Sequence, residues 1–258
     1  MTTASVLAML AMALPAVAIA QEFAAPTSRA TLGPGALLER ALPNGATGAS
    51  LATLLTRWPL AMTARSLIAG GAFRGVAAEA GVASAGDDAL GWNAAGLALG
   101  IADRVAGAAA RAVVRRDHES PVELPAVGVE TGMGGWMSLG PMRIWASAPQ
   151  AFLAGESPPL PRGLTAGVEW AAGGVALGLE REAPRQGIVE PAAHAARLSL
   201  ALAGITAWTE LRDQPLRGGV GIEATVGALR VASQVDGHPV LAPTVRMSLA
   251  LERRRPDS

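Results

Sequence analysis

The side chains that could carry chemistry in this sequence are few and lie far apart. Its histidines are His118, His194 and His238, and it has no cysteine, which excludes cysteine-ligated metals. The triplet Asp117-His118-Glu119 is compact, but a metal needs convergent ligands, so we prefer a solvated loop. The sequence has no nucleophile elbow, no zinc-protease helix motif and no phosphate loop with its lysine. We therefore expect no enzyme activity, no metal and no cofactor.

The remaining charges follow a different rule, because they alternate with apolar residues. Arg197, Glu223, Arg230 and Arg246 each stand between two apolar neighbours. In an extended strand, successive side chains point to opposite faces of the sheet. Such charges line a lumen or a solvated sheet by default, and nothing supports a catalytic pair. If the sheet closes in lipid, these four residues are candidates for the lumen lining.

The elements that carry these residues have a period of two. Apolar and polar or small residues alternate over 164–170, 175–179, 198–202, 220–226, 229–235 and 245–251. This alternation is typical of antiparallel β-structure with one apolar face. It does not by itself say whether lipid or a protein core covers that face.

The connections between these segments distinguish two kinds of β-fold. Tight turns are expected at Gly140-Pro141, 172–174, Ala203-Gly204 and Gly227-Ala228, and they alternate with longer connectors. An up-and-down meander with all its tight turns at one end produces this order, as in outer-membrane barrels. A Greek-key sandwich mixes long and short links. The order therefore favours an all-β, antiparallel, up-and-down transmembrane barrel.

The first half of the chain gives weaker signals. Residues 1–20 contain an uncharged apolar run that ends in Ala18-Ile19-Ala20, which indicates a secretory signal peptide, with a buried helix as the alternative. Within 21–60, the spacing of Leu51, Leu54, Leu55 and Trp58 predicts a short helical segment, either a plug or a surface helix. The alanine-rich stretch 104–116 fits a helix or a strand, and we interpret it as a strand. Residues 61–258 would then form a barrel of about 12 strands.

Composition narrows the class further. The 258 residues carry 21 arginines and lysines against 21 acids, are 50% hydrophobic and include no tyrosine. A chain of this hydrophobicity without net charge is not disordered, and the lack of a basic excess argues against nucleic-acid binding. The six tryptophans are the candidates for the aromatic girdles that barrels place at membrane interfaces.

Residues 64–98 resemble the entry region of the outer-membrane long-chain fatty-acid transporter superfamily and its shorter PorV/PorQ relatives. The shared features are Gly70-Gly71-Ala72, Asp87-Asp88-Ala89 and the positions Asn93, Gly96 and Leu97 of a later motif, in which Ala94 replaces a proline. The resemblance implies an outer-membrane barrel that passes or binds small apolar solutes. It equally implies, as an alternative, a non-transporting barrel that acts as an anchor or secretion partner.

These observations leave two locations open. The expected one is the outer membrane of a Gram-negative-type cell, with membrane lipid as the partner of the apolar face. The alternative is a soluble β-sheet protein of the periplasm that binds a ligand or partner.

Overall fold

The computed structural model describes residues 48–57, 63–86, 91–103, 105–118, 126–155, 164–183, 192–214, 216–237 and 242–254. These residues form strands and their connections, and no helix among them is long and apolar enough to cross a membrane. The proposed leader 1–20 and segment 21–47 lie outside the described residues.

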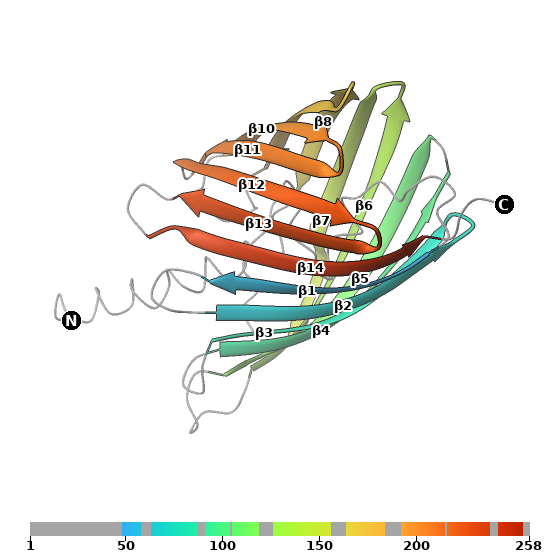
Figure 1. The fold of residues 1–258 in the computed structure, drawn as a ribbon. Coiled ribbons are helices and arrows are strands. Elements are labelled where there is room, and N and C mark those ends of the chain that lie inside the picture. Colours follow the sequence, from blue (N-terminus) through green and yellow to red (C-terminus); the bar gives the residue numbers. More distant parts are fainter. Residues whose placement is uncertain are drawn as a thin grey trace.

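Fourteen antiparallel strands form one closed barrel in which each strand pairs with its neighbours in the sequence (Figure 1). The first and last strands close it over ten residue pairs, from Gly48↔Arg254 to Arg57↔Val245. The strands are β1 (Gly48–Arg57), β2 (Thr63–Phe73), β3 (Val76–Gly86), β4 (Gly91–Ala102), β5 (Ala106–His118), β6 (Ala126–Leu139), β7 (Met142–Gly155), β8 (Thr165–Ala172), β9 (Val175–Glu182), β10 (Ala193–Leu202), β11 (Ile205–Asp213), β12 (Leu216–Val226), β13 (Leu229–Gly237) and β14 (Thr244–Arg254).

Two sequence-based predictions about the strands are wrong. The barrel has 14 strands and not about 12, because two-residue turns need less chain for each hairpin than we assumed. The helical segment predicted around Leu51–Trp58 is also wrong, since Gly48–Arg57 is strand β1. Leu51 and Leu55 point outward while Leu54 is buried on the inner face, so apolar residues occupy both faces and imitate helical spacing.

The alanine-rich stretch that fitted either a helix or a strand is a strand. Residues 106–118 form β5, which pairs with β4 and β6 over nearly its full length. Alanine favours a helix intrinsically, but each strand of a closed barrel gains backbone hydrogen bonds on both sides. The non-local pairing therefore outweighs the local propensity.

The tight turns lie at one end of the barrel, as the order of connections predicted. Gly173-Gly174 and Ala203-Gly204 have two consecutive residues with positive φ, which is the geometry of a type I′ hairpin turn. Gly140 and Gly227 also have positive φ at the start of their turns. The other connectors lie at the opposite end, which we call the loop end. They are longer, except that only two residues separate Asp213 of β11 from Leu216 of β12.

The two faces of the sheet differ as the alternation predicted. Large apolar side chains such as Leu179, Val220 and Leu249 are exposed on the outer face. Their neighbours Glu180, Gly219 and Ser248 are buried or half-buried on the inner face. The barrel therefore has an apolar outer wall and a charged or small-residue inner wall.

Candidate functional site: the barrel interior

The inner wall divides into two parts. In β1–β4 it consists mainly of small neutral side chains, and Glu79 is the acidic residue of its described positions. Ala64, Ala83 and Ala94 pack with Trp92 in one buried cluster there. From β5 to β14, arginines and carboxylates recur on nearly every strand. The charged part is the candidate functional surface.

Ion pairs join neighbouring strands across this charged wall. Arg143 Nη2 lies 3.2 Å from Glu169 Oε1 on β8, directly opposite it in the register. Arg111 on β5 reaches Glu130 on β6 diagonally, at 3.4 Å, and its side chain is 0% exposed. Facing positions on adjacent strands bring side chains within contact range. Opposite charges at such positions stabilise one another where water is partly excluded.

A third pair spans three strands. Arg212 on β11 contacts Glu182 on β9, with Nη2 2.5 Å from Oε2. The intervening strand β10 places Ala193 and Ala195 at its inner positions. Because these methyl groups are short, the two long side chains can meet above them.

The fourth pair lies near the seam of the barrel. Arg246 on β14 contacts Asp236 on β13, with Nη1 2.5 Å from Oδ2, and Gln234 donates a hydrogen bond from Nε2 to Oδ1 of the same carboxylate at 2.6 Å. This carboxylate therefore receives two donors, which fixes the position of Arg246.

The structure places the four residues proposed from sequence on the inner wall. Arg246 is buried, whereas Arg197, Glu223 and Arg230 are half-buried. The register sets Arg197 opposite Glu210. Glu223 and Arg230 lie diagonally across β12 and β13. The four residues come from four strands and form no single compact cluster.

Sequence reasoning missed the role of tryptophan. We expected all six tryptophans at the membrane interfaces. Trp92, Trp136, Trp145 and Trp208 are instead buried on the inner face, Trp170 is exposed on the outer one, and Trp58 lies outside the described residues. The pairing register between strands explains why these rings fit on the inner face, because three of the indoles lie over a glycine of the neighbouring strand.

Each of these glycines is directly opposite its tryptophan. The pairs are Trp136 with Gly107, Trp145 with Gly167 and Trp208 with Gly221. A Cβ added to Gly107 would lie 2.5 Å from Trp136 Nε1, and one added to Gly167 would lie 2.6 Å from Trp145 Cε2. Only glycine leaves room for the ring, so the indoles pack flat on the inner wall.

The family-motif positions do not converge on a site. Asn93 and Leu97 are exposed on the outer face of β4, while Gly96 lies on its inner face. His194 pairs with Asp213 on the outside, Nδ1 to Oδ2 at 2.8 Å. Among the described residues, no group of three histidine or acidic side chains could hold a metal ion.

The pairing and the faces together define the class of fold. A closed antiparallel sheet with an even number of strands, an apolar outer wall and a polar interior is that of an outer-membrane β-barrel. The assignment to this class rests on the closed pairing of the 14 strands within this chain.

The chain matches no family model and no curated protein. Solved structures of mutants of the Rhodopseudomonas blastica porin are similar to it, with 10% identity and a TM-score of 0.43, covering 81% of this chain and 99% of theirs. A structure described as "Asymmetric conductivity of engineered proteins" covers the same shares, with 9% identity and a TM-score of 0.43.

Proposed function

We propose that this protein resides in the outer membrane and provides an aqueous path for small hydrophilic solutes. The observation that carries the proposal is the contrast between the two walls. Leucine, valine and isoleucine predominate at the outer positions, while paired arginines and carboxylates recur among the inner positions of β5–β14. An apolar coat suits lipid, and a charged lining suits water and polar solutes.

The lining does not support the expectation of an apolar solute. Burying an apolar molecule against Arg143, Glu169 and their neighbours would remove water from charged groups at high cost. A small hydrophilic solute can replace that water with its own hydrogen bonds. We therefore favour polar solutes over the apolar solutes that the family resemblance implies.

Conductance tests this function directly. The purified full chain in a planar bilayer should give discrete current steps, and liposomes that contain it should swell in small neutral sugars. Arg230→Glu, on the inner wall, should shift the ion selectivity toward cations. The matched control Arg181→Glu, on the outer face of β9, should leave selectivity unchanged.

We also propose that residues 21–47 act as a plug. Gly48, where β1 begins, lies at the end with the tight turns, and the inner wall of β1–β4 consists mainly of small residues. Alanine and glycine positions leave room for a packed segment. Deleting 21–47 should raise the conductance of each barrel. If neither form conducts, the non-transporting anchor or secretion partner becomes the preferred function.

Export and location form a separate part of the proposal. A leader of 20 residues would leave Gln21 as the mature N-terminus, which N-terminal sequencing of the membrane fraction can check. The protein should resist extraction by carbonate and show heat-modifiable mobility on gels. Quantitative release into the soluble periplasmic fraction would contradict the membrane location.

A further inference from the structure

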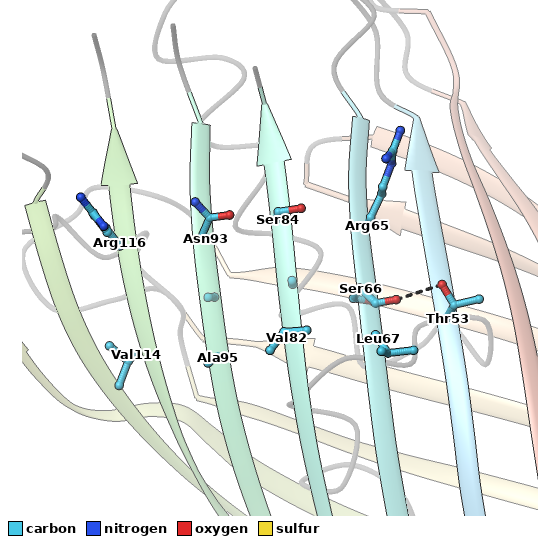
Figure 2. A pocket seen from close by; sticks show the side chains of 12 residues that line it. Thr53, Arg65, Ser66, Leu67, Val82, Ser84, Asn93, Ala95, Val114 and Arg116 are labelled. Carbon is cyan, nitrogen blue, oxygen red and sulfur yellow. Dashed lines mark hydrogen bonds between the residues drawn. The ribbon is translucent and has the colours of Figure 1, made fainter. Parts of the chain in front are cut away.

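The outer wall of the barrel is hollowed over β1–β5, close to the loop end. The groove has a volume of about 590 Å³, and most of its lining residues point away from the barrel interior (Figure 2). A groove in an apolar outer wall can receive a ligand from the surrounding membrane.

Four polar residues form the upper row of this groove. Arg65 on β2 lies opposite Ser84, Ser84 lies opposite Asn93, and Asn93 lies opposite Arg116 on β5. Figure 2 shows all four at the same level, with an arginine at each end of the row. Three strand spacings of ~4.8 Å separate the two arginines, about 14 Å in all.

An apolar row lies directly beneath the polar one. Leu67, Val82, Ala95 and Val114 face one another in the same register. Toward the tight turns, Ala69 and Ala80 continue the outer face of β2 and β3 with small side chains. The groove thus combines a polar row near the loop end with an apolar row farther from that end, both on the outer wall.

The arginines lie at the height expected for lipid headgroups. From Arg65 to Phe73, the outer positions of β2 carry no further charge. Eight residues span about 26 Å along a strand, and a tilt of 35–45° reduces this to about 20 Å, close to the apolar band of such barrels. At the other boundary, the guanidinium of Arg74 lies 5.1 Å from the ring centre of Phe73.

No acidic partner offsets these two arginines among the residues that the structure describes. Neither Arg65 nor Arg116 makes an ion pair there, and the described outer positions of β1–β5 contain no aspartate or glutamate. On the outer face at the start of β10, by contrast, an acidic residue is present, because His194 pairs with Asp213. The described residues that line the groove therefore carry two positive charges and no negative charge at headgroup height. Guanidinium groups bind phosphate oxygens in a bidentate manner.

We propose that this groove binds a membrane lipid whose headgroup carries two phosphates, one at Arg65 and one at Arg116. Ser84 and Asn93 would hydrogen-bond the polar groups between the phosphates, and an acyl chain would lie over Val82 and Ala95. This inference rests on the proposed membrane location.

Binding of defined lipids to the full chain in zwitterionic detergent tests the site. The probes are diphosphoryl lipid A, monophosphoryl lipid A and inorganic pyrophosphate. We expect the diphosphoryl lipid to bind at least tenfold more tightly than either of the others. Arg65→Gln with Arg116→Gln should remove that preference, and Ala95→Leu should weaken the binding of both lipids by filling the groove.

Arg181→Gln is the matched control, since Arg181 is also exposed on the outer wall near the loop end. An equal loss with this variant would show unspecific attraction to basic residues and overturn the proposal. Equal affinity for pyrophosphate would mean a free-phosphate site and would also overturn it. Heat-modifiable mobility of each variant, measured in parallel, separates loss of the lipid site from failure of the barrel itself.

Discussion

At the scale of single residues, the inner wall depends on indole rings that lie flat on glycine backbone. Gly221→Ala would place a methyl group in contact with the ring of Trp208 and force the indole to move. We expect a loss of stability of about 1–3 kcal/mol and a shift in tryptophan emission, both measurable by urea unfolding. Gly178→Ala is the control, because its added Cβ would meet only the Val168 carbonyl at 4.0 Å. Equal effects of the two substitutions would contradict the packing described.

Asp103 has a separate role in the connection between β4 and β5. Its Oδ1 accepts hydrogen bonds from the backbone N–H groups of Val105 and Ala106, both at 2.7 Å. These bonds, the one from Ala106 first, lower the pKa of the Asp103 carboxyl below its usual value. Because the folded pKa is lower than the unfolded one, the stabilisation is present above the unfolded pKa and is lost as the pH falls through the folded pKa.

Asp103→Ala tests this linkage. The variant should be less stable than the parent at pH 7, and the difference should shrink as the pH falls below the ordinary range of an aspartate. Unfolding midpoints measured across this pH range supply the comparison. A difference that stays constant down to the lowest pH would contradict the role of the carboxylate.

At the scale of elements, the hairpin turns determine how tightly the strands connect. Ala203 has a φ of 47° at the first position of a turn, where a Cβ is unfavourable by roughly 1–2 kcal/mol. Ala203→Gly should therefore stabilise the β10–β11 hairpin by about 1 kcal/mol. Gly174→Ala should destabilise the β8–β9 hairpin, because its Cβ would lie 2.6 Å from the Ala201 carbonyl oxygen on β10.

The neighbouring Gly173 is the control for this pair. It has a similar positive φ of 58°, but a Cβ there would meet nothing within 4 Å. Gly173→Ala should thus cost less stability than Gly174→Ala in thermal unfolding of the folded barrel. The reverse order would contradict the close approach of Gly174 to the Ala201 carbonyl oxygen.

The elements also show how far sequence reasoning reaches. The six segments from 164 to 251 were predicted as strands because charged and apolar residues alternate clearly there, and the structure confirms them. In β1–β4, alanine and glycine occupy most of the inner positions, so the two faces differ little in polarity and the local signal is weak. Strand β1 was mistaken for a helix, since it gains its stability from pairing with β14 at the far end of the chain.

The site shows the same limit for a different reason. The alternation of side chains between the two faces of each strand was enough to propose Arg197, Glu223, Arg230 and Arg246 for the inner wall. The pairs Arg111–Glu130 and Trp208–Gly221 depend on register between strands, and no periodicity within one strand specifies register. Local pattern therefore predicts which way a side chain points, but not what it contacts.

At the scale of the whole molecule, the outer wall must tolerate lipid and the inner wall must tolerate charge. Leu179 is exposed on the outer face of β9, whereas the adjacent Gly178 lies on the inner face opposite Glu169 and Arg197. Leu179→Arg should destabilise the inserted barrel by about 2–4 kcal/mol. Gly178→Arg should assemble, because a neighbouring carboxylate can pair with it. Assembly yields in membranes, judged by heat-modifiable mobility, would distinguish the two, and a reversed order would mean that the faces are misassigned.

Nitroxide scanning of β9 tests the central claim, that lipid covers the outer wall, most directly. The chain has no cysteine, so single cysteines at positions 175–182 can each carry one spin label in the folded, bilayer-reconstituted protein. We predict high oxygen accessibility at 175, 177, 179 and 181, and high accessibility to a water-soluble nickel complex at the positions between them. Loss of this two-residue period, or the opposite phase, would contradict a barrel whose apolar face meets lipid.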